Sequence, residues 1–290
     1  MNQSDHGEGL PSSEQSQDGC RSSAHLLRTA RPRRLRACSS VVQALGWHVT
    51  MRLADSRVIA KEPWERRVAA FSLLELAAAF GLIAFHLVDT HLHALIVGSR
   101  ERAGVFARRI EGTLHARLRL GCPFEAARFS PVGDQARLAS TFAYVLDQAE
   151  RHQLVNDPLR EGSSLPDLVG LRVVHADGIA HCARRHLPRL RPEEFAARYL
   201  PAPCTTKLDC AQLAEAAAAV LALPHLRTRA PRAVLAKHAA VVVGLAEGFS
   251  VREIAGALGL STRRIERLRR TPPPAAAVVQ ATRWQLRLRS

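Results

Sequence analysis

The chain has 290 residues, 47% of them hydrophobic, and 41 lysines and arginines against 26 aspartates and glutamates give it a formal net charge of +15. This composition excludes a wholly disordered or collagen-like chain and fits a globular protein of roughly two domains. The excess charge is mostly arginine, whose planar fork binds phosphate oxygens, so nucleic acid is the expected class of partner.

No apolar run of about eighteen residues is present, and no signal-peptide pattern opens the chain. We therefore expect a cytoplasmic, nucleoid-associated protein without a membrane partner.

Residues 1–45 are expected to form a disordered basic leader. Residues 1–24 are rich in Ser, Gln, Gly and acidic residues, and such segments bury too little apolar surface to fold. The run LRTARPRRLRAC follows at 27–38. It is either a solvated tail or an arm that contacts phosphates, and the two interpretations are compatible.

Residues 46–157 alternate between strand and helix patterns. The successive segments are a strand at 47–54, a helix at 63–80, a β-hairpin at 81–98, an arginine-rich helix at 99–121, a strand at 124–132 and a helix at 133–154. Pro63 suits a first helical turn, and Asp89-Thr90 separates the two β-rich runs of the hairpin. This order predicts an α+β fold, a ferredoxin-like antiparallel sheet with helices on one face.

The rest of the chain is predicted to be all-α. It divides into a connector of loops and helices at 158–230, a helix-turn-helix domain at 231–271 and a basic tail at 272–290. In FSVREIAGALGLSTRRIERLRR (249–270), Gly259 suits a turn with positive φ, Ser261 caps the second helix and Ile265 faces inward. A helix of this kind would contact the major groove of duplex DNA through Ser261, Thr262, Arg263, Arg264, Arg267 and Arg270. A purely structural helical hairpin fits the same pattern.

His91 and His93 lie two positions apart in THLHALIV (90–97), so a strand would place both imidazoles on one face. Two such rings can chelate a divalent metal, or they can simply form a polar strand face. With 13 histidines in the chain, the spacing alone does not decide.

The chain has two tyrosines, so the search for a phenolic nucleophile is short. Tyr144 lies in a predicted helix with Gln148 one turn later on the same face. A phenol beside an amide oxygen could attack phosphorus next to a bound metal. An ordinary helix tyrosine packed on the sheet is the alternative. Tyr199 precedes Pro201 and has no helical partner after it.

Three blocks of sequence, WHVTMRL (47–53), FHLVDTHLHALIV (85–97) and AYVLDQAERHQLV (143–155), resemble in order and spacing the REP-associated tyrosine transposases, single-tyrosine HUH enzymes. The resemblance covers residues 46–157 and implies an HUH fold. It implies that His91 and His93 bind Mg²⁺ or Mn²⁺ with Gln148, and that Tyr144 is the nucleophile. Gln148-Ala149 stands where many relatives have Asn-Pro, and Thr90 stands where they have Asn.

Members of this family cleave single-stranded DNA beside a hairpin, form a covalent 5′-phosphotyrosine and rejoin strands without ATP. The resemblance implies the same substrate here, with His48 at a family position in the first strand. We expect His48, Arg52, Arg108 and Arg109 to contact DNA, whereas His86 and His115 are expected at polar surfaces. Whether the tyrosine helix serves its own site or that of a partner in a homodimer stays open.

Two other functions fit parts of the sequence. A non-catalytic DNA-binding regulator derived from a transposase would keep the fold and the helix-turn-helix. A metal-dependent phosphoesterase that uses water is less well supported, because no carboxylate cluster accompanies the histidines.

Overall fold

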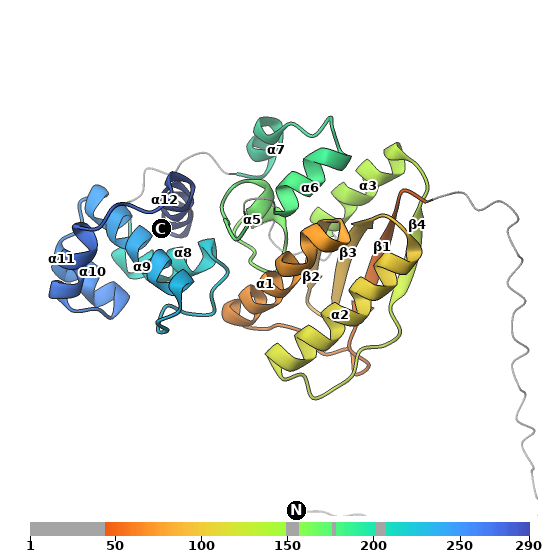
Figure 1. Cartoon of the computed structure of the whole chain (residues 1–290), viewed down its shortest axis with the longest axis horizontal. Helices are drawn as coiled ribbons and strands as arrows, with labels where there is room; N and C mark the ends of the chain where they lie inside the picture. Colours follow the sequence, from red (N-terminus) through yellow and green to blue (C-terminus); the bar gives the residue numbers. More distant parts are fainter. Residues whose placement is uncertain (1–43, 149–156, 176–177, 201–206) are drawn as a thin grey trace, which may run out of the picture. The chain divides into compact units, whose positions relative to one another are not determined.

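The computed structural model describes residues 44–148, 157–175, 178–200 and 207–290, and the strands in these ranges form one antiparallel sheet (Figure 1). The strands are β1 (Gly46–Arg52), β2 (Leu82–Val88), β3 (His91–Val97) and β4 (Arg128–Val132). Their spatial order is β2-β3-β1-β4, with every neighbouring pair antiparallel. Almost all of the predicted leader, with its arginine run, lies outside the described residues.

The β2–β3 hairpin forms where the sequence predicts it. Asp89 and Thr90 separate the two strands, and Val88 pairs with His91 directly across them. β3 also pairs with β1, which sets Thr50 opposite His93. Because alternate residues of a strand share a face, this register decides which side chains the two strands present together.

Two helices cover one face of the sheet. α1 (Pro63–Phe80) begins at its predicted proline, and the Glu65 carboxylate accepts the backbone N–H of Glu62 at 2.9 Å. α2 (Arg100–Leu118) begins where the Ser99 side chain accepts the backbone N–H of Arg102 at 3.2 Å. Side chain–backbone bonds of this kind satisfy amide groups that have no partner inside a helix. Both helices pack their apolar residues on β1, β2 and β3 in one core.

α3 (Gln135–Leu146) covers the opposite face, so the prediction that all helices lie on one face is wrong. Leu138, Phe142 and Val145 of α3 share a core with Ile83 and Leu95 of the sheet. The physical reason is that this face also carries apolar side chains, which would be exposed without a covering helix. The predicted helix at 133–154 is confirmed over α3, and its residues from 149 onward lie outside the described part.

The connector contains short helices next to the sheet. They are α5 (Leu165–Leu168), α6 (Ile179–His186) and α7 (Pro192–Tyr199). α6 packs against β2 and α1, with Ile179 in the core of the α1 face and Ala183 in the core of the α3 face. α6 therefore covers the β2 side of the sheet.

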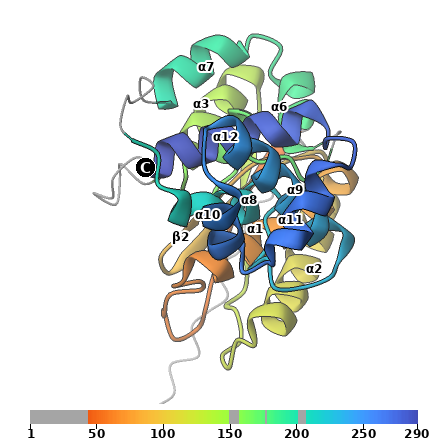
Figure 2. The same ribbon diagram turned by 90° about the vertical axis from the view of Figure 1, so that its left-hand side faces the viewer.

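The C-terminal helices lie together (Figure 2), and their buried residues form a core of their own. The elements are η1 (Cys210–Gln212), α8 (Leu213–Val220), α9 (Pro231–Ala246), α10 (Val251–Leu258), α11 (Thr262–Arg269) and α12 (Ala276–Arg289). The region predicted as a basic tail contains α12, which packs on α8 and α9. Val278, Ala281 and Leu286 bury its apolar stripe.

The chain is thus an α+β protein with a four-stranded antiparallel sheet. Within the described ranges, no helix combines the length and the apolar character needed to cross a bilayer.

Candidate active site

Three histidines of β1 and β3 share the face of the sheet that α3 covers. In the register of β1 and β3, His48 pairs with Leu95, and Thr50 pairs with His93. His48, His91 and His93 therefore project to one side of the sheet. The prediction that His91 and His93 share a strand face is confirmed, with ring centroids 4.6 Å apart.

His48 contacts His93 directly. Its Nε2 lies 2.9 Å from Nδ1 of His93, and the two rings stack with an interplanar angle of 13°. Burial lowers the pKa of His48 from its ordinary value of 6.5. A neutral His48 imidazole can share one proton with Nδ1 of His93 and thereby fix the orientation of that ring.

Tyr144 reaches the histidines from α3. The Asp134 side chain caps this helix by accepting the backbone N–H of Arg137 at 2.7 Å. The Tyr144 ring is half-buried and meets the rings of His48 and His93 edge-on, with centroids 5.6 and 5.9 Å away. The structure therefore brings the predicted nucleophile to His93, one of the two predicted metal-binding histidines, although the two residues are about fifty positions apart in the chain.

Gln148 is 1% exposed and follows Tyr144 by one helical turn. Its Nε2 donates to the carbonyl oxygen of Tyr144 at 2.8 Å. Because an amide nitrogen does not coordinate metals, Oε1 is the atom of Gln148 that could serve as a ligand.

The two histidines on β3 have their Nδ1 atoms held in similar ways. Nδ1 of His91 lies 3.2 Å from Oγ1 of Thr90, and Nδ1 of His93 lies next to His48. Metal-binding histidines commonly have one ring nitrogen fixed by such a neighbour, with the other directed at the metal. The pair therefore fits two ligands of a divalent ion. Within the described ranges, no group of three or more His, Cys, Asp or Glu side chains could hold one.

The prediction that His86 lies at a polar surface is wrong, whereas His115 is exposed on α2 as expected. His86 is 2% exposed in β2 and pairs with His93 of β3. α3 and α6 both pack on β2. Residues 162–164, which we call the strap, run along the outer side of this strand. Ser163 of the strap forms a bridge with His86.

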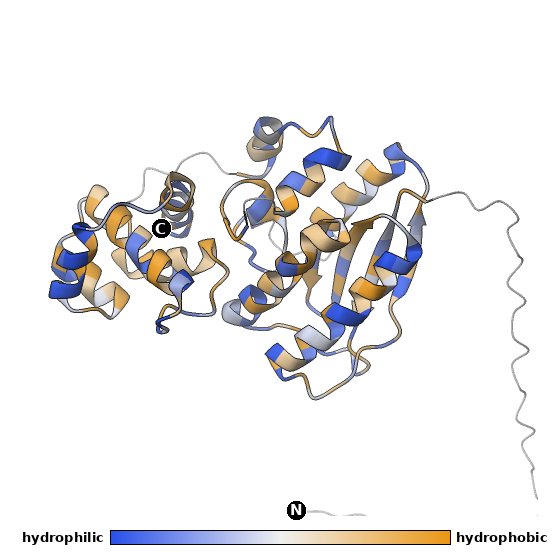
Figure 3. Ribbon diagram, in the orientation of Figure 1, coloured by the Kyte–Doolittle hydropathy of each residue, from blue (hydrophilic) through white to orange (hydrophobic). Residues whose placement is uncertain are grey.

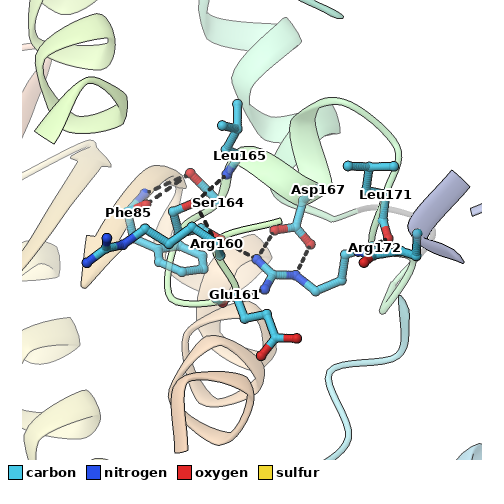
Figure 4. Close-up of polar contacts among 10 residues, drawn as sticks. Phe85, Arg160, Glu161, Ser164, Leu165, Asp167, Leu171 and Arg172 are labelled. Atoms are coloured by element: carbon cyan, nitrogen blue, oxygen red, sulfur yellow. Dashed lines mark hydrogen bonds and ion pairs between the residues drawn. The ribbon is translucent and has the colours of Figure 1, made fainter. Parts of the chain in front are cut away.

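The strap is hydrogen-bonded to β2 through its backbone and one side chain (Figure 4). Gly162 O accepts the N–H of Leu87 at 2.8 Å, and Ser164 N donates to Phe85 O at 2.9 Å. Oγ of Ser164 lies between the N–H and the carbonyl of Phe85, at 3.1 and 3.2 Å. The backbone groups of β2 next to His86 therefore have partners on both sides.

Arg172 holds the strap in place (Figure 4). It pairs with the Asp167 carboxylate through both Nε, at 3.0 Å, and Nη2. Nη1 donates to Glu161 O at 2.7 Å, and Nη2 also donates to Ser163 O. Buried charges are tolerated when paired and fully hydrogen-bonded in this way. The sequence carried no signal for this cluster, because a lone arginine in a loop has no periodic pattern.

Three arginines predicted to contact DNA occupy different positions. Arg52 lies on the histidine face and forms two hydrogen bonds to Glu125, at 2.6 and 2.8 Å. Arg108 and Arg109 are exposed on α2, which packs on the other face. The structure does not bring these two side chains to the histidines.

The turn between α10 and α11 has the local geometry that the sequence predicts. Gly259 ends α10 in the left-handed region with φ of 59°, and the Ser261 side chain accepts the backbone N–H of Arg264 at 3.3 Å. Ile265 and Leu268 are buried against α9 and α10. Figure 3 shows how strongly hydrophilic the rest of α11 is. The predicted contact residues Ser261, Thr262, Arg263, Arg267 and Arg270 are exposed, and Arg264 is half-exposed.

Comparison with protein-family models, with curated proteins and with solved structures gave no match.

Proposed function

We propose that this protein cleaves and rejoins single-stranded DNA at hairpin-bearing sites through a covalent 5′-phosphotyrosine on Tyr144. The observation that carries the proposal is the packing of the Tyr144 ring against His48 and His93. A phenol in contact with the ring of His93, whose centroid lies 4.6 Å from that of His91, supports a tyrosine nucleophile beside the two proposed metal ligands.

In the proposed reaction, the Tyr144 oxygen attacks the phosphorus of a phosphodiester. The bond from phosphorus to the 3′ oxygen breaks, and the released strand takes up a proton as its 3′ hydroxyl. Because one phosphate ester replaces another, a 3′ hydroxyl can reverse the step and rejoin strands without ATP.

The phenol has an ordinary pKa near 10, so it must lose its proton as the new bond forms. Mg²⁺ or Mn²⁺ bound by His91, His93 and Gln148 would supply positive charge to the phosphate oxygens. His48 would orient the ring of His93, and Thr90 would orient the ring of His91. Both ligands would therefore be held in position before substrate binds.

The strand order supports this proposal. A β-α-β-β-α-β succession with the spatial order β2-β3-β1-β4 is the ferredoxin-like arrangement expected of an HUH domain. The same order fits the resemblance to REP-associated tyrosine transposases. The exposed arginines of α11 support a second DNA contact, with duplex DNA, by a helix-turn-helix formed from α9, α10 and α11.

A non-catalytic DNA-binding regulator is the second candidate. The observation that favours it is that the exposed arginines of α11 form a cationic surface by themselves. This surface includes no residue of the histidine face. Such a protein would bind duplex DNA and form no adduct.

The test uses the full chain with Mn²⁺ and labelled single strands that carry hairpins with randomised flanking sequences. We expect a denaturation-resistant protein–DNA adduct that is lost in Tyr144→Phe and strongly reduced in His91→Ala. Tyr199→Phe is the matched control, because the chain has two tyrosines and the Tyr199 hydroxyl donates to Asp147 at 2.7 Å. This variant should retain the adduct.

An adduct that persists in Tyr144→Phe would exclude the proposed nucleophile. Tight duplex binding without an adduct on any member of the pool would favour the regulator.

A further inference from the structure

A cleft of about 680 Å³ lies among the C-terminal helices. One wall is the loop at 225–229 that precedes α9, and the opposite wall is the end of α10 with its turn, 256–260. Lys237 of α9 and Glu215 of α8 also line it. The cleft lies outside the histidine site and apart from the side chains of α11 assigned to the major groove.

The cleft is rich in positive charge that has no carboxylate partner in the described part of the chain. Arg227 and Arg229 are exposed, and no ion pair joins either of them to a described carboxylate. Lys237 donates through Nζ to the carbonyl oxygen of Thr228 at 3.0 Å, which ties the basic loop to α9.

Glu215 is the one acidic side chain among the described residues that line the cleft. Its Oε1 lies 2.8 Å from Nη1 of Arg67, which is 3% exposed. Arg67 also lies 3.5 Å from Glu161, which pairs with Arg289 at 2.9 Å, so two arginines balance these two carboxylates. Glu215 therefore does not cancel the charge of the basic side chains that line the cleft. The cleft is therefore suited to an anion.

Gly256 leaves one wall of the cleft open. It lies inside α10, where glycine is less favourable than alanine by roughly 1 kcal/mol. A Cβ placed there would meet no atom within 4 Å, and its φ lies outside the left-handed region. Neither crowding nor backbone conformation requires glycine at this position. The absence of a side chain at Gly256 leaves the cleft wider at the wall that faces the basic loop.

We propose that this cleft binds a phosphate-bearing ligand, with Arg227, Arg229 and Lys237 as its cationic contacts. Guanidinium groups bind phosphate oxygens through two parallel hydrogen bonds, and lysine adds a point charge. The phosphate can come from the backbone of a duplex bound by α11 or from a free nucleotide polyphosphate. The first source rests on the proposed DNA-binding function, whereas the second does not.

Two variants probe the cleft in different ways. Arg229→Gln with Lys237→Gln removes two charges, and Gly256→Leu fills the space from a helical position that accepts a side chain. Their matched controls are Arg252→Gln, an exposed arginine of α10 that does not line the cleft, and Gly112→Leu, an exposed helical glycine of α2 that also has open space around it. Thermal unfolding checks that each variant is folded.

Binding is measured by calorimetry with inorganic tripolyphosphate, and by fluorescence anisotropy with duplex DNA over a range of salt concentrations. We expect both cleft variants to weaken binding at least tenfold in one of the two assays, while both controls bind as the wild type does. Loss of tripolyphosphate binding alone identifies a nucleotide-type ligand. Loss of duplex affinity, with a lower salt slope in the charge variant, identifies the DNA backbone.

The proposal is overturned if the charge variant weakens binding but Gly256→Leu does not, because the cations would then act as an open surface. It is also overturned if neither variant changes either assay. The adduct assay with Tyr144→Phe is independent of both measurements, so failure of the cleft and failure of the proposed function can be distinguished.

Discussion

Arginine has different surroundings next to the sheet and on α11. The Arg172 side chain is 1% exposed, and it pairs with Asp167 and donates to backbone carbonyls that hold the strap. Arg263 and Arg267 of α11 are exposed, and neither forms an ion pair with a described carboxylate. One group is part of the folded interior, whereas the other is available to a partner.

This difference shows what a net charge can and cannot indicate. All arginines contribute equally to the formal charge of +15, from which nucleic acid was expected as a partner. A buried arginine that is paired in the fold adds little to the attraction of a polyanion, whereas exposed ones on a single helix add directly to it. The distribution of the charge therefore supports DNA binding more specifically than its sum does.

The largest expected effect comes from breaking the buried group. Arg172→Leu leaves the Asp167 carboxylate buried without its partner, and we expect the free energy of unfolding to fall by about 3–5 kcal/mol. Urea denaturation followed by circular dichroism measures the change. The double variant Arg172→Met, Asp167→Leu should regain part of the loss, because no unpaired charge remains.

A loss below about 1 kcal/mol in the single variant would mean that the pair does not stabilise the fold as its burial implies. It would also remove the contrast with the arginines of α11.

The exposed group should behave in the opposite way. Replacing Arg263 and Arg264 together by alanine should change the free energy of unfolding by no more than about 0.5 kcal/mol. Duplex affinity should fall, and the salt slope should decrease by about two if both side chains contact phosphates. Anisotropy at several salt concentrations measures both quantities.

Arg57→Ala is the control, since this exposed arginine lies in the loop after β1 and pairs with Asp55 at 3.4 Å. An equal loss of duplex affinity in the control would mean that net charge, and not its position on α11, governs binding. Cleavage of a minimal hairpin should be unaffected by the α11 variant.

The smallest expected effect concerns His48. Its folded pKa is below 6.5 because it is partly buried. Near pH 6.5, His48 takes up a proton in the unfolded chain but stays neutral in the folded chain. The stabilisation present above about pH 6.5 is therefore lost as the pH falls. The free energy of unfolding of metal-free protein should therefore decrease less between about pH 7 and 5.5 in His48→Gln.

His186→Gln is the comparison variant for this measurement, because burial also lowers the pKa of His186 but the side chain lies on α6. Identical pH dependence in the wild type and His48→Gln would show that burial does not lower the pKa of His48 in the folded protein.

The sequence predicts most of the elements that depend on neighbouring residues. The hairpin at Asp89-Thr90, the start of α1 at Pro63, and the turn and cap at Gly259 and Ser261 all rest on local signals. The shared face of His91 and His93 follows from strand geometry alone.

Features that depend on distant partners were not predictable in this way. The face that α3 covers is set by apolar residues of three strands, and the strap pairs with Phe85 across 79 residues of chain. α12 is different, because its buried residues have a helical spacing from which the helix could have been predicted. They are Val278, Ala281, Thr282, Gln285 and Leu286.

The strap also bears on the solubility of this chain. All seven residues of β2 are buried, and β2 lies at the end of the strand order. An apolar edge strand with unpaired backbone groups is a template onto which another chain can add a strand. By bonding to Phe85 and Leu87, the strap occupies that edge with the chain's own backbone. Loosening the strap would therefore favour aggregation through β2 even where the histidine site stays intact.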